Sequence, residues 1–288
     1  MSCQVDGEAT HNGNVSKIEE QSLAPESSAT EAIIDTDKAP EKIYFLKRFF
    51  DDHPRLDVLL EVGAGQLHMS TKIAEFAIWE AIDDSLYIYR QAGLGFKVLQ
   101  SVGNVEYTGT VSMSKDKHSF GQKTCGFVGT RDAKGQLQIL KLAISGTSFT
   151  PRRDEDKHDF IFDAKWANRV KQFAKKMKIN LRTIYDGHSR KTKPENIGNW
   201  RSGHIEKKLS THIVWTFLSM YRLIDQSGKV SLKNFLELRQ LLQHEGRKPR
   251  FELHLSRGPC GTPQRVGRCV PFVSKLSKLT GICFTIHS

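Results

Sequence analysis

Gly203-His204-Ile205-Glu206-Lys207-Lys208-Leu209 is the stretch from which the organisation of this chain is best understood. Apolar residues follow it up to about Ile224, and they cover more of a helix than the single stripe of an exposed amphipathic helix. We therefore expect a central helix that opens at His204. Further along comes Gly258-Pro259-Cys260-Gly261-Thr262-Pro263-Gln264-Arg265-Val266-Gly267-Arg268-Cys269, which adds two thiols to the imidazole and the carboxylate of the first stretch.

Helical geometry limits where these groups can meet. Residues two apart lie roughly 200° around an ideal helix, so His204 and Glu206 can face one site only in the first turn, beyond the regular ladder. Pro271 falls in the first turn of a second predicted helix, where proline is tolerated, and Cys269 then stands at the N-terminus of that helix. Helix N-termini favour anionic ligands and thiolates.

These residue types favour a zinc site. Zinc accepts histidine nitrogen and cysteine sulfur, and a catalytic site keeps three protein ligands and one open position for water. His204, Cys260 and Cys269 are the three candidate ligands. Bound zinc lowers the pKa of its water from about 15.7 to about 7. Glu206 is the candidate catalytic residue, because a carboxylate that does not bind the metal can move protons between water and substrate.

The order His-x-Glu, then Pro-Cys, then Cys resembles the signature of the zinc-dependent deaminase superfamily of cytidine and nucleic-acid deaminases. Eight residues separate Cys260 from Cys269, where the family usually has two to four, but glycines and Pro263 between them can build a turn. Cys125 is the fallback ligand if Cys269 is not one. The resemblance covers about residues 120 to 288, and it is closer to the divergent toxin-like and fungal nucleic-acid deaminases than to free-nucleoside enzymes.

The resemblance implies a fold and a reaction. The fold is a cytidine deaminase-like three-layer α/β/α sandwich with a mixed sheet, in which a hairpin is followed by parallel strands joined by the metal-bearing helices. The reaction is hydrolytic loss of ammonia from a base, with cytosine expected and adenine as the alternative. The substrate is single-stranded DNA or RNA, or a nucleotide. The residues expected to contact it are Arg257, Arg265, Arg268 and Thr147.

The pattern of the same half of the chain agrees with this order. Two β-type runs, 125–130 and 136–144, flank a turn that contains Asp132 and Gly135 and predict a hairpin. Residues 150–200 are interpreted as an insertion beside the site, either a clamp for backbone phosphates or a solvated decoration. His212 and His254 are expected to be structural. The remaining predicted elements are a helix within 160–178, a helix from 231 to about 246, a strand at 250–256, a helix to about 279 and a strand at 282–286.

The first part of the chain divides into two regions. Residues 1–41 are polar and hold nine acidic residues against two lysines, and this composition predicts a disordered acidic leader. Residues 42–112 are predicted to be a helical N-terminal region, preceding a deaminase-like domain at 113–288. The segment Leu59–Gly65 resembles the first motif of methyltransferases that bind S-adenosylmethionine, which is the competing interpretation; otherwise it is a turn between two helices.

Composition sets the outer bounds. The chain has 288 residues, with 43 Lys and Arg against 32 Asp and Glu, a net charge of +11 and a pI near 9.4. A basic chain suits a polyanionic partner. Because the five cysteines lie far apart, the N-terminus is polar and no apolar run approaches about 20 residues, we expect an intracellular protein, cytoplasmic or nuclear, without a membrane segment. A catalytically inactive zinc-containing module that binds nucleic acid remains an alternative to the enzyme.

Overall fold

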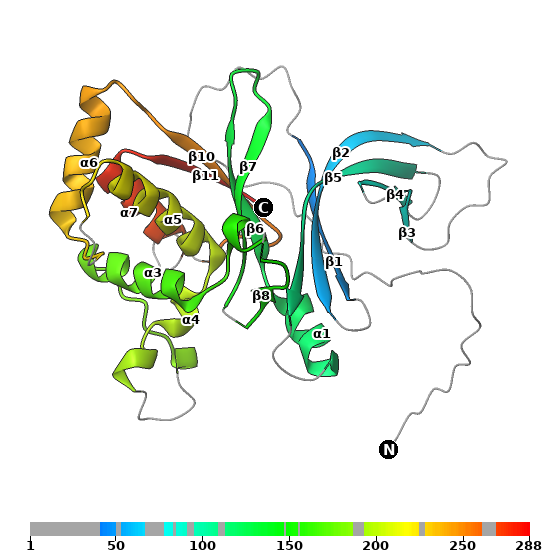
Figure 1. Ribbon diagram of the computed structural model, residues 1–288, viewed down its shortest axis with the longest axis horizontal. Coiled ribbons are helices and arrows are strands. Elements are labelled where there is room, and N and C mark those ends of the chain that lie inside the picture. Colours follow the sequence, from blue (N-terminus) through cyan, green and yellow to red (C-terminus); the bar gives the residue numbers. More distant parts are fainter. Residues whose placement is uncertain are drawn as a thin grey trace.

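The computed structural model is a mixed α/β fold built from two sheets and a group of helices (Figure 1). The helices lie against one face of a five-stranded sheet, and a six-stranded sheet lies on the other side of it. The structure describes residues 41–49, 53–66, 78–82, 85–90, 95–108, 113–146, 148–154, 156–186, 193–224, 228–260 and 269–288. The predicted leader at 1–41 lies outside these ranges except for its last residue.

Five of the six strands of this sheet come from residues 42–112, the region that was predicted to be helical, and that prediction is wrong. The order is β1-β2-β5-β4-β3, with β8 paired to β5, and all neighbours run antiparallel. Ile43 and Leu46 are both buried, but they pack into clusters on opposite faces of β1. Because β1 is covered on both faces, its apolar residues lose the alternation of a half-exposed strand and imitate a helical spacing. The strands are β1 (Ile43–Phe49), β2 (Pro54–Gln66), β3 (Ile78–Ala81), β4 (Leu86–Arg90), β5 (Gly95–Thr108) and β8 (Thr150–Pro151).

The segment Leu59–Gly65 lies entirely within β2. Its residues pair with β5, and Gly65 stands opposite Phe96. The strand-to-loop turn that the methyltransferase interpretation requires is therefore not formed there, and neither is a turn between two helices.

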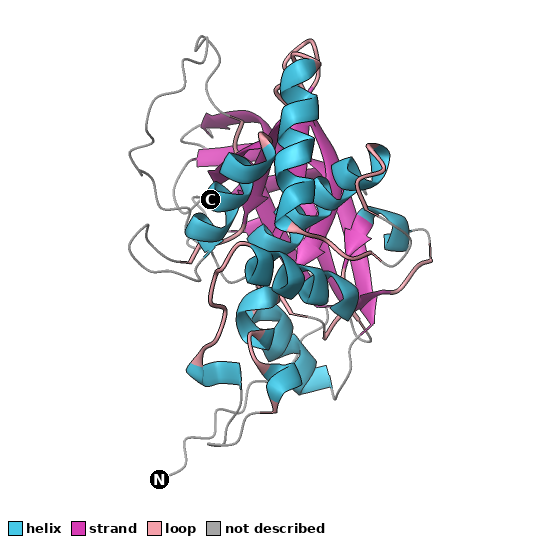
Figure 2. Ribbon diagram, turned by 90° about the vertical axis from the view of Figure 1, so that its left-hand side faces the viewer, coloured by secondary structure: helices cyan, strands magenta, loops and turns pink. Residues whose placement is uncertain are grey.

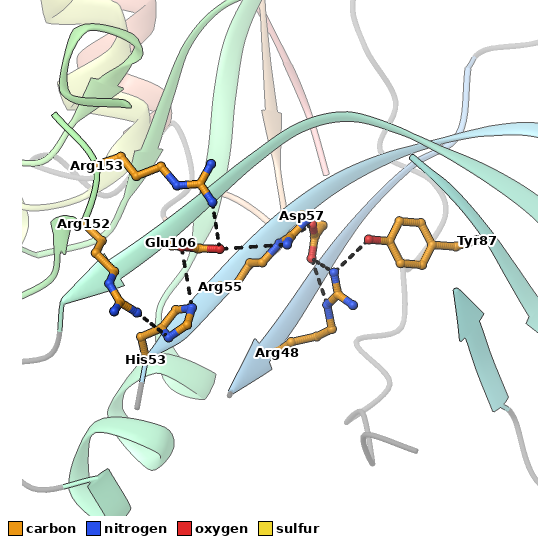
Figure 3. A network of polar contacts seen from close by, with 8 residues as sticks. All are labelled: Arg48, His53, Arg55, Asp57, Tyr87, Glu106, Arg152 and Arg153. Atoms are coloured by element: carbon orange, nitrogen blue, oxygen red, sulfur yellow. Dashed lines mark hydrogen bonds and ion pairs between the residues drawn. The ribbon is translucent and has the colours of Figure 1, made fainter. Parts of the chain in front are cut away.

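Ion pairs fix the six-stranded sheet on the side shown in Figure 3. Asp57 is fully buried, and its two oxygens accept hydrogen bonds from Arg48 and Arg55, the latter at 2.9 Å. Arg48 also donates to the hydroxyl of Tyr87 at 2.8 Å. Burial of the Asp57 carboxylate is tolerated because two guanidinium groups balance it. This network therefore has a structural explanation.

The five-stranded sheet confirms the predicted hairpin and the mixed character of the sheet. Its order is β11-β10-β6-β7-β9; β6 pairs antiparallel with β7 and β10, whereas β10 pairs parallel with β11 and β7 with β9. In the hairpin turn, the Asp132 carboxylate accepts hydrogen bonds from the backbone N–H groups of Lys134 and Gln136, and Gly135 has a φ of 76°. The strands are β6 (Cys125–Arg131), β7 (Leu137–Ile144), β9 (Phe160–Ile161), β10 (Arg250–Leu255) and β11 (Cys283–His287).

The longer helices of the C-terminal half cover one face of this sheet, as Figure 2 shows from their own side. They confirm the helices predicted for this half of the chain. The first residues of α5 are all buried, from Ile205 to Thr211, which places this helix at the centre as expected. The helices are α1 (Met113–Gln122), α2 (Asp156–Asp159), α3 (Ala164–Lys176), α4 (Asn199–Ser202), α5 (Ile205–Met220), α6 (Leu232–His244) and α7 (Cys269–Thr280), with 3-10 helices η1 (Ile184–Asp186) and η2 (Pro194–Asn196).

The other face of the five-stranded sheet corrects the predicted layering. Phe127 and Ile144 on that face pack with Val58 and Val105 of the six-stranded sheet, in one cluster. In the described part of the chain the third layer is thus a sheet, where the α/β/α expectation had helices (Figure 1). The apolar residues of β6 could not reveal whether a helix or a sheet would cover this face, because both offer an apolar surface to pack against it. Among the described helices, none combines the length and the apolar character that a membrane crossing needs.

Candidate metal centre

The start of α5 is held in place by the end of β7. The backbone N–H of Gly146 donates to the carbonyl of Gly203 at 2.9 Å, and a Cβ on Gly203 would lie 3.3 Å from the Cα of Gly146. The buried Lys208 donates to the carbonyls of Ile144 and Gly146, at 2.6 and 3.0 Å. Burial lowers the pKa of Lys208 to about 7. These contacts fix the direction in which the chain enters the helix.

A second close approach brings the first turn of α5 down onto the sheet. Gly126 of β6 lies beneath it, and a Cβ there would be 2.4 Å from the carbonyl oxygen of His254 and 2.8 Å from the Cδ1 of Ile205. Only a residue without a side chain fits between the strand and the helix at this point. The beginning of α5 is therefore buried against the five-stranded sheet.

His204 is the N-cap of α5 and lies outside its regular ladder. Its backbone is extended, with φ −70° and ψ 136°. This confirms the expectation that the helix opens at His204. The two cysteines come from later elements of the chain. Cys260 follows β10, and Cys269 is the first residue of α7. The backbone N–H of Cys269 donates to the carbonyl of Cys260 at 2.8 Å. Residues 261–268 between them lie outside the described part of the chain.

The three predicted ligands converge. Cys260 Sγ lies 3.3 Å from His204 Nδ1 and 3.2 Å from Cys269 Sγ, and Cys269 Sγ lies 3.4 Å from His204 Nδ1. The donor atoms thus form a nearly equilateral triangle that could hold a metal ion. A disulfide between the two cysteines would not require an imidazole nitrogen at similar distances from both sulfurs.

The surroundings affect the two thiols in opposite ways: they favour thiolate at Cys260 and oppose it at Cys269. A hydrogen bond from Cys269, followed by one from His204, lowers the pKa of Cys260 to about 3 against the opposing effect of burial. Burial raises the pKa of Cys269 well above its usual value. Cys260 is therefore a thiolate at neutral pH, which is the form that binds metals.

Lys207 is a fully buried lysine whose Nζ donates to Cys269 Sγ at 3.0 Å. Among the described residues this sulfur is its only partner. A cation in the first turn of a helix is electrostatically unfavourable, and a buried ammonium needs an anion beside it. The ammonium acts with the hydrogen bonds in lowering the pKa of Cys260, and it opposes the effect of burial on Cys269. Sequence reasoning missed this residue; its only signal is a lysine pair at the start of a helix that was expected to be central.

Glu206 has its side chain buried in the first turn of α5, 4% exposed. Within the described ranges its carboxylate has no hydrogen-bond or ion-pair partner. Its charge adds to burial in raising the pKa of Cys269, so it lies within electrostatic reach of the donor group. A carboxylate without a protein partner beside a group of metal donors is a candidate for a functional group.

A second group of donors lies on the same sheet. Glu252, His254 and His287 also lie close enough together to hold an ion. Glu252 is engaged, however, by Arg131 at 2.6 Å and by His254 at 2.9 Å. The two imidazole rings stack, with centroids 4.6 Å apart and planes 12° apart. The structural role expected for His254 agrees with these contacts. Parallel strands were expected here, but the register of β10 and β11 that sets His254 beside His287 was not foreseen.

The other residues singled out in the sequence have the following places. Arg257 donates to the carbonyls of Gly121 and Gln122 at the end of α1, so its guanidinium supports that helix. The fallback ligand Cys125 is fully buried and apart from the donor group, and burial raises its pKa to about 11. His212 packs against Trp166, and burial lowers its pKa to about 4. Three residues lie outside the described ranges: Thr147, Arg265 and Arg268.

No family model, curated protein or solved structure matches this chain. The geometry of the site and the motif order of the sequence are therefore the observations from which a function can be inferred.

Proposed function

We propose that this protein is a zinc-dependent hydrolase that removes the exocyclic amino group of a nucleobase, with cytosine as the first choice. One observation carries the proposal: an imidazole nitrogen and two sulfurs converge within 3.4 Å of one another beside the buried Glu206, whose carboxylate has no partner in the described residues. Three donors and one unbound carboxylate are the set that a hydrolytic metal site requires.

The donor set suits zinc. Tetrahedral zinc, with bonds of about 2.3 Å to sulfur and about 2.0–2.1 Å to nitrogen, separates its ligand atoms by about 3.6–3.8 Å. The separations of 3.2–3.4 Å here are a few tenths of an ångström shorter, so small movements outward would accommodate the ion. Thiolate and imidazole together also favour zinc over magnesium or calcium. When bound, zinc would supply a Lewis acid with an open position, where water becomes nucleophilic near neutral pH.

Glu206 would perform the proton transfers. In cytosine deamination a water oxygen adds to C4, the bond from C4 to the amino nitrogen breaks, and ammonia leaves uracil behind. Glu206 would take a proton from the water, deliver it to ring N3 and then pass a proton to the departing amine. Lys207 would balance the negative charge of Cys269, and His204 would offer Nδ1 as a donor with its proton on Nε2.

The order of elements supports the same proposal. A hairpin of β6 and β7 comes first, the helix α5 with its His-x-Glu start follows, and α7 with Cys269 joins the parallel strands β10 and β11. This is the order that the resemblance to zinc-dependent deaminases implies. The six-stranded sheet on the far face and the eight residues between the cysteines are departures from it. The net charge of +11 favours a polynucleotide over a free nucleoside as substrate.

The test is ammonia release by purified, zinc-loaded protein from single-stranded DNA, single-stranded RNA and free cytidine and adenosine. The wild type should deaminate at least one of them. Glu206→Gln should keep its zinc and lose activity by about 100-fold or more, because a positioned acid–base contributes roughly 10²–10⁴-fold. Zinc-loaded wild type that releases no ammonia from any of these substrates would refute the enzyme and leave a zinc-containing binding module.

A further inference from the structure

Two exposed aromatic side chains stand at the edge of the metal centre. Tyr185 of η1 is 63% exposed and Trp200 of α4 is 43% exposed, and no other tyrosine, tryptophan or phenylalanine in the described part of the chain is exposed to this degree. Their ring centroids are 5.1 Å apart, with planes inclined by 43°. The rings of Trp200 and His204 are also in contact, with centroids 4.5 Å apart and planes inclined by 72°. An aromatic surface thus continues from a metal-donor ring out to solvent.

The backbone that carries these rings is held in place. The buried carboxylate of Asp186 accepts hydrogen bonds from the backbone N–H of Thr183 at 2.7 Å and of Trp200 at 3.1 Å, which ties η1 to α4. Lys171 of α3 donates to the side chain of Asn199 at 2.8 Å. Gly198 has a φ of 80° at the N-cap of α4, a conformation that favours glycine. The two rings are therefore presented by connected segments rather than by an unattached loop.

The surrounding segment is strongly basic. Residues 164–201 contain eleven Lys and Arg and only two acidic residues. Exposed aromatic rings within a basic segment are typical of surfaces that bind single-stranded nucleic acid, where bases stack on the rings and cations attract the phosphates. The remaining exposed large hydrophobic residues of the described chain are aliphatic; Ile184 and Ile197 lie beside the two rings in the sequence, and the others are scattered, which needs no functional explanation.

We propose that Tyr185 and Trp200 form a stacking platform for nucleotides that neighbour the base in the metal centre. The ligand is then a single-stranded polynucleotide, because a free nucleoside has no neighbouring base to stack there. The inference rests on the proposed function only in placing the target base at the metal centre. Single strands suit the platform because their bases are already unpaired, whereas duplex bases are stacked on one another.

The experiment measures binding of short fluorescein-labelled oligonucleotides to the full, zinc-loaded chain by fluorescence anisotropy. Single-stranded DNA, single-stranded RNA of the same sequence and the DNA duplex are compared. Tyr185→Ala should weaken single-strand binding by roughly 5- to 150-fold, the range measured when a stacking ring is removed. Tyr185→Phe, which keeps the ring, should bind like the wild type, and so should the control Met220→Ala, which removes an exposed side chain elsewhere.

Salt titration separates stacking from charge. Tyr185→Ala should leave the slope of log affinity against log salt unchanged, whereas loss of a phosphate-binding lysine would reduce it by about 0.7 per contact. Trp200→Ala should weaken binding in the same range, and its zinc content is measured in parallel because Trp200 touches His204. Tyr185 makes no such contact in the described residues, so its variant remains informative if Trp200→Ala loses zinc.

The outcomes distinguish this inference from the proposed function. If wild type releases no ammonia but Tyr185→Ala still loses single-strand binding, the platform stands and the deaminase does not. If Tyr185→Ala binds and deaminates single strands like wild type, the platform is refuted and the deaminase stands. Equal affinity for duplex and single strands would also overturn the platform. A preference between DNA and RNA would identify which single strand it accepts.

Discussion

The two groups of potential metal donors differ in what else their members contact. His204, Cys260 and Cys269 form one group and Glu252, His254 and His287 the other, and in both the donor atoms lie within 4.8 Å of one another. In the first group the donors contact mainly one another and Lys207, whose charge favours thiolate. In the second, the one carboxylate is already bound by Arg131 and His254.

Direction separates the groups as well. The lone pair of an imidazole nitrogen lies in the ring plane, so the lone pairs of two stacked rings lie in nearly parallel planes and are not directed at one ion between them. The rings of His254 and His287 are inclined by only 12°, and Phe127 stacks on the other face of His254. Proximity alone therefore does not make a metal centre. Donors must also be free of other strong partners and must point at a common position.

Removal of one thiol is the largest expected effect. Cys269→Ala should lower the zinc content of the purified protein from about one ion per chain to background, because two remaining donors cannot hold the ion. Glu252→Gln should leave zinc unchanged, and so should Cys283→Ala, which removes an exposed cysteine. Zinc per chain is measured by inductively coupled plasma mass spectrometry. If Cys269→Ala kept its zinc and Glu252→Gln lost it, the metal would be bound by the group of Glu252, His254 and His287 instead.

The next largest effect is expected from the two cations that contact these groups, Lys207 beside Cys269 and Arg131 beside Glu252. Lys207→Met should weaken zinc affinity by roughly 10- to 100-fold, the usual consequence of removing a partner of a metal ligand, because the charge that balances Cys269 is lost. Arg131→Met frees Glu252 from its ion pair but should create no second stoichiometric site, since the stacked rings still do not converge. Competition with a chromophoric chelator measures both. A second zinc ion bound by Arg131→Met would show that Arg131, rather than ring geometry, is what excludes the metal.

Much of the C-terminal half could be predicted because its signals are local. The turn at Asp132 and Gly135 marks the hairpin, and His204 precedes a long apolar helix. The N-terminal sheet was missed in part because its first strand, β1, is covered on both faces, so that Ile43 and Leu46 suggest a helical spacing. The second outer layer was missed for a related reason, since an apolar sheet face does not specify whether a helix or a sheet will cover it.

At the site, the donors could be predicted and their supporting residues could not. His204, Cys260 and Cys269 belong to a recognisable order of residue types. Lys207 and Cys269 are 62 positions apart, and their contact depends on how α5 and α7 pack. Trp200 was passed over for the same reason, because its exposure and its contact with His204 are properties of the folded chain. Arg257 was expected to meet substrate, yet nothing in its sequence surroundings indicates that its guanidinium supports the end of α1.

The smallest effect concerns Glu252, in the group that we expect to bind no metal. A hydrogen bond with His254, followed by one from Arg131, lowers the pKa of Glu252 to about 2. Because this pKa lies below that of the unfolded chain, about 4.3, Glu252 stabilises the fold above that pH, and the contribution is lost as pH falls toward 2. Glu252→Gln should thus be less stable at pH 6 by about 1 kcal/mol, since the site is partly exposed and screened.

Urea unfolding of wild type and Glu252→Gln at a series of pH values should show this difference closing between about pH 5 and pH 2. Loss of zinc at low pH affects both proteins equally and cancels in the comparison. The exposed Glu195, changed to Gln, serves as the control and should show no such gap. If the gap instead stayed constant down to pH 2, Glu252 would act through packing rather than charge, and the ion pair would no longer explain why this group is unsuited to a metal.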